Sequence, residues 1–300
     1  MAWIPGGTFR MGSDRHYPEE APARDVRVQG FLMDVVTVTN AQFREFVDAT
    51  GYVTLAERPA SRDDYPDADP ALLAPASIVF TKTTGPVDLR DHRHWWTYVA
   101  GADWRHPEGP GSTIASRDEH PVVHVAYADA TAYAAWAGKS LPTEAEWERA
   151  ARGGLEAAEY VWGDDYMPGG TPMANTWQGE FPWQNLLHDG FESTAPARSF
   201  APNGYGLYQM AGNVWEWTSD FYRSHASVRK ACCTLDDPRG GTADESHDPD
   251  AASRIPRRVT KGGSYLCAPS YCQRYRPAAR MAQPVDTSTC HLGFRCVVRV

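Results

Sequence analysis

The sequence predicts one domain of the α+β class, spanning residues 1–300, with little regular secondary structure. Glycine and proline account for 48 of the 300 residues (25 Gly and 23 Pro) and are spread along the chain, which favours many turns and irregular loops. Aromatic residues make up 12% of the chain, so it can fill a large core and is not disordered. We find neither an internal repeat nor a linker that would divide the chain.

The first elements follow from alternation and capping. Apolar alternation predicts strands at 3–13 and 26–38, each interrupted by glycine. Thr39 and Gln42 are spaced as a capping box, and they predict a helix that ends near Gly51.

Residues 55–120 contain the densest Pro, Asp and Gly content. They predict a long ordered excursion held down by Trp95, Trp96, Tyr98 and Trp104.

Two helices are expected in the middle of the chain. The run 121–125 reads as a buried strand, and 127–137, rich in small residues, reads as a helix. Thr143 and Glu146 form a second capping box, so another helix should begin there and stop at Gly153.

No long helix is expected after residue 154. The segments 203–222 and 259–267 predict short strands between glycine turns, and 292–300 predicts a closing strand.

Charge and hydropathy exclude two classes of partner. The net charge is -9 and basic residues form no long run, so the electrostatic footprint of a nucleic-acid-binding protein is missing. No apolar run reaches the roughly 18 residues of a membrane span. The N-terminus lacks the basic and apolar parts of a signal peptide, and we expect a monomeric cytoplasmic protein with reduced thiols.

One cysteine pair stands out among the six cysteines. Cys267 and Cys272 lie in GGSYLCAPSYCQRYRPAAR (262–280), which has the period of neither a helix nor a long strand. The pair therefore lies on a shaped loop, where chemistry is often placed. Two thiols without a nearby histidine suit a soft metal such as Cu(I), or a redox couple; an ordinary disulfide and two unreactive thiols are the alternatives. Ser264 and Tyr271 flank the pair and offer hydroxyl groups.

Several segments together resemble one family. They are IPGGTFRMGS, VTNAQF, GADWRHPEGP, HPVVHVAYADATAYAAWAGKSLPTEAEWERAARGG, NTWQGEFP, NGYGLYQMAGNVWEWTSD, KGGSYLC and LGFRC. This pattern is similar to the formylglycine-generating enzyme (sulfatase-modifying factor) family, and we expect a bacterial member. The 262–280 stretch and GADWRHPEGP mark the formylglycine-generating branch, whereas the other segments also fit non-catalytic and iron-dependent relatives.

The resemblance implies a fold and a reaction. The fold is a compact C-type-lectin-like domain. The reaction oxidises the cysteine of a Cys-x-Pro-x-Arg motif, in an unfolded sulfatase polypeptide, to Cα-formylglycine with O2 and Cu(I). Cys267 and Cys272 match the two copper ligands, and the substrate cysteine would supply a third sulfur.

The resemblance also implies structural Ca2+ at two sites, with oxygen ligands of the kind that calcium prefers. The first set is Asn175, Thr176, Asp189 and Phe191. The second set is Gln209, Gly212, Val214 and Glu216. A salt bridge or a cap is the alternative role for Glu216.

The substrate groove is expected to use Trp104, Arg105 and His106, with Trp104 stacking on the substrate proline. Core packing is an equal alternative for Trp104. His120 and His124 fit structural roles better than a metal pair.

Some positions depart from the family pattern. Ala134, Ala150 and Pro277 stand where secreted relatives form two disulfides, which supports the cytoplasmic expectation. His291 replaces a common asparagine, with a role left open between tuning copper and packing.

The remaining cysteines are expected to play no part in the chemistry. Cys290 and Cys296 are expected to be buried thiols, and the vicinal Cys232–Cys233 pair is expected to be a surface feature without a function.

Two other functions compete with the oxidase. A non-catalytic lectin-like binding module would use the same scaffold but has no need of the cysteine pair. A metal-free thiol-disulfide oxidoreductase would use the pair without copper, and copper-dependent oxygen uptake would separate it from the oxidase.

Overall fold

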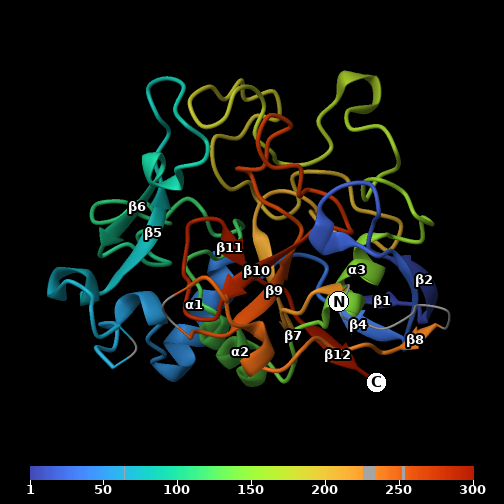
Figure 1. Cartoon of the computed structure of the whole chain (residues 1–300), viewed down its shortest axis with the longest axis horizontal. Coiled ribbons are helices and arrows are strands. Elements are labelled where there is room, and N and C mark those ends of the chain that lie inside the picture. The colour runs from blue at the N-terminus through green and yellow to red at the C-terminus, as the bar shows by residue number, and fades with distance from the viewer. Residues whose placement is uncertain (64, 226–233, 252–253) are drawn as a thin grey trace.

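The computed structural model describes residues 1–63, 65–225, 234–251 and 254–300, and it confirms the mixed α/β class with few helices and several small sheets (Figure 1). The α-helices are α1 (Asn40–Thr50), α2 (Tyr127–Trp136) and α3 (Glu144–Ala151). The strands are β1 (Ala2–Ile4), β2 (Gly7–Met11), β3 (Arg24–Val28), β4 (Phe31–Met33), β5 (Ala76–Phe80), β6 (Trp96–Ala100), β7 (Trp215–Phe221), β8 (Leu235–Asp236), β9 (Arg257–Lys261), β10 (Arg280–Pro284), β11 (Leu292–Gly293) and β12 (Val297–Arg299). Single 3-10 turns lie at Pro18–Glu20, Leu55–Glu57, Pro70–Leu73, His92–His94, Pro168–Gly170 and Asp244–Ser246.

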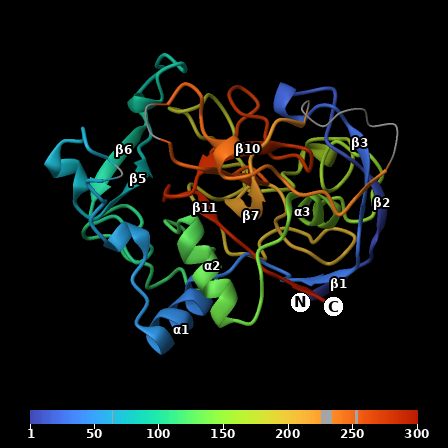
Figure 2. The same cartoon turned by 60° about the horizontal axis from the view of Figure 1, so that its bottom comes forward.

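The strands pair into small sheets. The central one has the order β10-β9-β7-β11, with β7 and β11 parallel and the other pairs antiparallel. A second sheet has the order β1-β4-β12, so both ends of the chain join the same sheet, and the two termini lie side by side (Figure 2). The remaining sheets are β2-β3-β8 and the antiparallel pair β5-β6, which stands at the edge of the molecule opposite the termini (Figure 1).

The predicted helix boundaries are confirmed at the capping boxes. The Thr39 hydroxyl accepts from the Gln42 backbone N–H at 3.3 Å, and the Gln42 side chain accepts from the Thr39 backbone N–H at 3.0 Å. The same exchange joins Thr143 and Glu146 at the start of α3. Gly51 ends α1 with a φ of 67°, a conformation that disfavours side chains with a Cβ.

The helices bury aromatic side chains against the central sheet. The ring centroid of Phe43 in α1 lies 5.2 Å from that of Trp104 and 6.0 Å from that of Tyr133 in α2. These rings join Trp217 of β7 and Phe294 in one cluster. Rings of this size bury large apolar areas, so this cluster supplies much of the hydrophobic stabilisation.

The strand expected at 121–125 is wrong. Only Pro121 pairs, with Thr39, and His124 has a φ of 59°, outside the strand region. His124 is fully buried, and its ring nitrogens lie 2.7 Å from Ser77 Oγ and 2.8 Å from the Pro107 carbonyl oxygen. Burial lowers its pKa to about 4, so the imidazole is neutral near neutral pH. The structural role expected for this histidine is confirmed.

Other strand predictions are right in part. Within 203–222 only β7 is a strand, and within 259–267 only the end of β9, because turns at positive-φ glycines occupy the rest. The segments 3–13, 26–38 and 292–300 each contain two strands.

The excursion at 55–120 is ordered in its described part and forms the β5–β6 hairpin. Within the described residues no helix is long and apolar enough to cross a bilayer.

Candidate functional site

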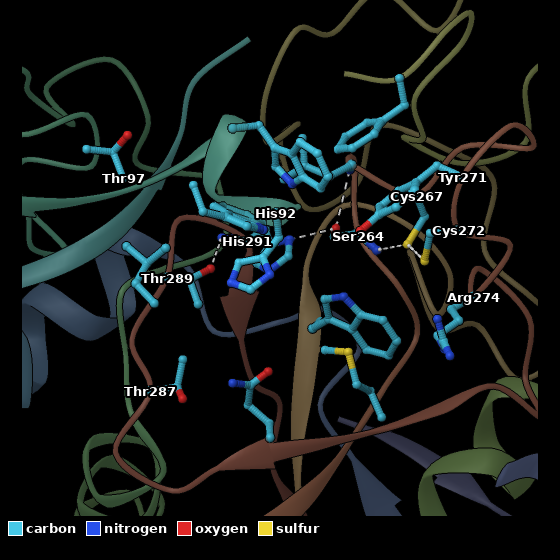
Figure 3. Close-up of a pocket in the computed structure, with 18 of the residues that line it drawn as sticks. His92, Thr97, Ser264, Cys267, Tyr271, Cys272, Arg274, Thr287, Thr289 and His291 are labelled. Carbon is cyan, nitrogen blue, oxygen red and sulfur yellow. Dashed lines mark hydrogen bonds between the residues drawn. The ribbon is translucent and has the colours of Figure 1, made fainter. Parts of the chain in front are cut away.

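A cavity of about 520 Å³ lies between the β5–β6 hairpin and the central sheet, and the cysteine pair stands at one end of it (Figure 3). Trp96, Thr97 and Tyr98 of β6 face it from one side, and Met281 and Gln283 of β10 from another. The loop between β9 and β10 also lines the cavity, through Ser264, Leu266, Cys267, Tyr271, Cys272 and Arg274.

The loop is folded back on itself by glycine and by tight turns. A Cβ on Gly263 would lie 2.7 Å from the Arg274 carbonyl oxygen, and its φ is 71°, so only glycine fits this crossing. The Cys267 N–H donates to the Ser264 carbonyl at 2.9 Å, and the Cys272 N–H donates to the Ala268 carbonyl at 2.8 Å. These turns bring the two cysteines of the sequence pair together.

The two thiols are close but not bonded. Their Sγ atoms are 3.1 Å apart, well beyond the ~2.05 Å of a disulfide, and both cysteines are free. Cys267 is 2% exposed, and burial raises its pKa. The hydrogen bond from Cys267 lowers the pKa of Cys272, and the charge of Arg274 adds to this effect. Cys272 is therefore the thiolate of the pair.

Ser264 links the thiols to His291 (Figure 3). Its backbone N–H donates to Cys267 Sγ at 3.4 Å, and its hydroxyl lies 3.0 Å from His291 Nδ1. Burial lowers the pKa of His291 to about 3, so this imidazole is neutral and can share the serine proton. The sequence identified His291 as a departure from the family pattern, with a role left open between tuning copper and packing, and the structure brings it into the cavity.

An aromatic wall encloses the thiol end of the cavity. The Tyr271 ring stacks on Phe181, with centroids 4.4 Å apart and planes 5° apart, and meets Trp95 edge-on at 5.6 Å. On the opposite side Trp96 meets His291 at 4.9 Å. Phe181 was not expected from the sequence, because no local pattern connects it to residues near 270.

Ion pairs fasten the loop after the thiols. Arg274 pairs with Glu19, Arg276 makes a two-pronged contact with Glu20 that includes a 2.9 Å bond, and Arg280 donates to Glu144 at 2.7 Å. Each pair joins the loop to a segment distant in the sequence.

The three residues expected to form the substrate groove do not line this cavity. Trp104 has no exposed surface and packs edge-on against Phe43, so the core-packing alternative describes it and the stacking role is not supported. Arg105 lies over the Trp104 ring and donates to Glu57 at 2.7 Å. His106 contacts Asp103. Identity alone could not tell which way the indole points.

The first expected calcium set contains one unsatisfied oxygen. Asn175 Oδ1 is buried and has no hydrogen-bond partner among the described residues, which suits a cation nearby. Asp189 already accepts from the Thr176 N–H at 3.1 Å and from Gln178 Nε2 at 2.7 Å, and the N–H of Phe191 also donates to it, at 3.0 Å.

The second expected calcium set consists of Gln209, Gly212, Val214 and Glu216. The side-chain oxygen of Gln209 is buried and has no hydrogen-bond partner in the described part of the chain. Glu216, however, accepts from Arg295 at 2.7 Å and from the Trp147 indole at 2.7 Å, as its salt-bridge alternative requires. Among the described residues no group of three or more His, Cys, Asp or Glu side chains forms a metal cluster.

Cys290 and Cys296 do not line the cavity. Both are free and buried, as expected. Cys232 and Cys233 lie outside the described residues.

Comparison with known proteins agrees with the motifs. Residues 1–300 match the family described as sulfatase-modifying factor enzyme 1-like domain. A protein named formylglycine-generating enzyme from Mycobacterium tuberculosis is 55% identical over 98% of this chain and 96% of its own length. A mouse protein named inactive C-alpha-formylglycine-generating enzyme 2 is 39% identical over 99% of this chain and 84% of its own length. Among solved structures, PvdO from Pseudomonas aeruginosa matches with a TM-score of 0.67 at 22% identity, covering 99% of this chain and 93% of that one, which supports the fold alone. The resemblance drawn from the sequence motifs is confirmed.

The unequal thiols predict selective alkylation. With the metal-free protein at neutral pH, iodoacetamide should modify Cys272 much faster than Cys267, because Cys272 is the thiolate and is more exposed. Arg274→Gln should slow this labelling by removing the nearby positive charge, whereas the exposed Arg93→Gln, on the same cavity, should not. Peptide mapping by mass spectrometry measures both rates. Equal labelling of the two cysteines would show that the pair is not polarised in this way.

Proposed function

The chain belongs to the family of sulfatase-modifying factor enzyme 1-like domains, and we propose that within it the chain is a formylglycine-generating enzyme. Relatives named formylglycine-generating enzyme support the conversion of a sulfatase cysteine to formylglycine as its activity. Because the family also contains proteins named inactive, membership alone does not carry the proposal. The observation that carries it is the pair of free thiols at the end of an open cavity.

The donor set fits Cu(I). Two cysteine sulfurs, one of them the thiolate, with no carboxylate among the described residues that line the same cavity, match the preference of a soft ion over a hard one. Cys267 and Cys272 would hold the ion, which when bound supplies the one-electron chemistry that O2 reduction needs. The cavity leaves room beside the two sulfurs for the substrate thiol as a third.

The overall change balances only with an outside reductant. Conversion of the cysteine side chain, a methylene carrying a thiol, to an aldehyde by O2, with release of hydrogen sulfide and water, takes up two further electrons and two protons. A two-electron reductant, such as a thiol, must therefore be present during turnover.

Side chains around the thiols control the access of water and the position of a proton. The Tyr271–Phe181–Trp95 wall limits access of water, and Ser264 with the neutral His291 can hold a proton next to Cys267.

The shape of the site supports the substrate partner that we propose. A cavity between a β-hairpin and the central sheet suits an extended segment better than a folded surface. We propose an unfolded sulfatase segment bearing Cys-x-Pro-x-Arg as that partner.

The test is direct. Incubation of the chain with Cu(I), O2, a thiol reductant and a Cys-x-Pro-x-Arg peptide should produce an aldehyde, detected by mass spectrometry as the replacement of the cysteine residue by formylglycine. Cys267→Ala and Cys272→Ala should each abolish Cu(I) binding and lower turnover by several orders of magnitude, while Cys296→Ala, which removes a buried thiol outside the cavity, should keep both.

The outcomes separate the competing functions. Full activity in either Cys267→Ala or Cys272→Ala would refute the mechanism. Peptide binding without oxidation would favour the binding module, and disulfide exchange without copper would favour the thiol-disulfide oxidoreductase.

We also propose structural Ca2+, supported by the unpaired side-chain oxygens of Asn175 and Gln209. Removing calcium with a chelator should lower the unfolding temperature by several degrees, since a ligand that binds only the folded state stabilises it. Asn175→Leu and Gln209→Leu should each reduce that chelator effect if their sites are filled. An unfolding temperature unaffected by the chelator would mean that neither site holds calcium.

A further inference from the structure

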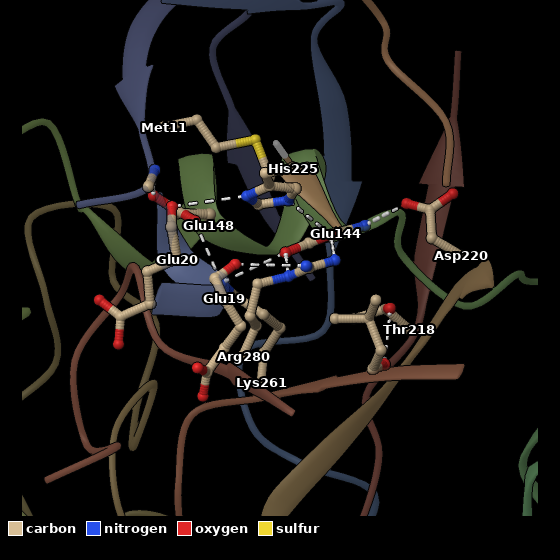
Figure 4. Close-up of polar contacts among 12 residues, drawn as sticks. Met11, Glu19, Glu20, Glu144, Glu148, Thr218, Asp220, His225, Lys261 and Arg280 are labelled. Atoms are coloured by element: carbon tan, nitrogen blue, oxygen red, sulfur yellow. Dashed lines mark hydrogen bonds and ion pairs between the residues drawn. The ribbon is translucent and has the colours of Figure 1, made fainter. Parts of the chain in front are cut away.

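A cluster of buried charged side chains joins α3 to β9 and β10 (Figure 4). Arg280 of β10 donates to both oxygens of Glu144, at 2.7 and 2.9 Å. Lys261 of β9 donates to Glu148 at 3.0 Å, and Arg152 donates to the same carboxylate at 2.6 Å. All five side chains are almost entirely removed from solvent.

A further buried arginine, Arg24 of β3, has no carboxylate of its own. It is 4% exposed, its Nη1 donates to the Pro22 carbonyl at 3.3 Å, and its Nη2 lies 3.8 Å from Met11 Sδ. Its Nε has no hydrogen-bond partner in the described part of the chain. Over the same residues, no Asp or Glu oxygen approaches the guanidinium within the 4.0 Å of a salt bridge.

The local charge is therefore unbalanced. Four buried cations share three buried carboxylates; the cations are Arg24, Arg152, Lys261 and Arg280, and the carboxylates are Glu144, Glu148 and Asp220. Asp220 lies 3.5 Å from Arg239 and accepts from the backbone N–H groups of Glu144 and Gly240.

Arg24 faces a small cavity. The cavity measures about 50 Å³, and its lining also includes two cations, Arg280 and Arg239, the imidazole of His225 and the carboxylates of Glu144 and Asp220. Burial lowers the pKa of His225, so its imidazole adds no positive charge at neutral pH. Since guanidinium groups only donate, what satisfies Arg24 must be an acceptor.

The size of the cavity limits the ligand. Its volume exceeds the ~30 Å³ share of one water molecule but is too small for a nucleotide or a phosphate ester. Water could accept the hydrogen bonds but would leave the excess positive charge uncompensated, and an unpaired buried charge is strongly unfavourable. We propose that this cavity is an anion site of halide size, which takes chloride on the guanidinium of Arg24.

The site would act on the fold rather than on the chemistry. Arg280, which shares the cavity, also donates to the Arg223 carbonyl at 2.9 Å and the Glu19 carbonyl at 3.4 Å. Glu19 in turn pairs with Arg274 beside the thiols. A bound anion thus stabilises the junction of β3, β9 and β10 to which the thiol loop is fastened.

Thermal unfolding of the full chain in chloride-free buffer tests the site. At constant ionic strength, replacing sodium gluconate, whose anion is too large for the cavity, by sodium chloride or bromide should raise the unfolding temperature by about 3 °C in a saturable manner. Arg24→Met keeps the bulk of the side chain and should abolish the response. Arg10→Met, which removes an exposed arginine on the neighbouring strand β2, should retain it.

A crystallographic measurement keeps the proposal testable if Arg24→Met does not fold. Crystals of the unaltered chain soaked in bromide should show an anomalous peak within hydrogen-bond distance of the Arg24 guanidinium. An unfolding temperature indifferent to chloride, an equal response in Arg24→Met, or a cavity that contains only water would each overturn the anion site. None of these outcomes depends on the oxidase activity.

Discussion

The structure depends above all on buried ion pairs that fasten an irregular loop. The loop between β9 and β10 contains no regular element, so the backbone ladders that hold a strand or helix are not available to it. Instead the buried pairs Arg276–Glu20 and, at the start of β10, Arg280–Glu144 hold it in place, and the partly exposed pair Arg274–Glu19 adds to them. Removing one partner of such a buried pair costs about 3–5 kcal/mol, because the other charge stays behind without compensation. The geometry of the thiols is thus set by carboxylates far away in the sequence.

This arrangement explains how a reactive site can stand on a chain with little secondary structure. The glycine crossing at Gly263 and the two turns bring Cys267 and Cys272 to 3.1 Å. The arginine that anchors the loop, Arg274, is also the cation that favours the thiolate of Cys272. The β5–β6 hairpin lies opposite this loop, and the cavity is enclosed between them. One set of charges therefore serves both folding and reactivity.

Residue spacing in the sequence predicted the features that depend on residues close together in the chain. Both capping boxes, the helices they start and the cysteine pair were found from spacing, since each depends on residues a few positions apart. The strand at 121–125 failed because His124 takes a left-handed conformation that its β-branched neighbours do not reveal. Strands β5, β6 and β10 were missed because they are short and lie among turn residues or end in proline. The two alternatives for Trp104 could not be separated because residue identity does not fix the direction in which an indole points. The pairs at Glu19, Glu20 and Glu144 join residues too distant for any local pattern.

The central claim is that Cys267 and Cys272 are the two protein ligands of Cu(I) and that the substrate cysteine adds the third sulfur. X-ray absorption at the copper edge, on the Cu(I)-loaded chain kept free of oxygen, tests it most directly. The account predicts two sulfur neighbours for the loaded protein and three after addition of a Cys-x-Pro-x-Arg peptide, with no change for the matching peptide that has serine in place of cysteine. Nitrogen or oxygen neighbours in the loaded protein, or a coordination unchanged by the cysteine peptide, would contradict it.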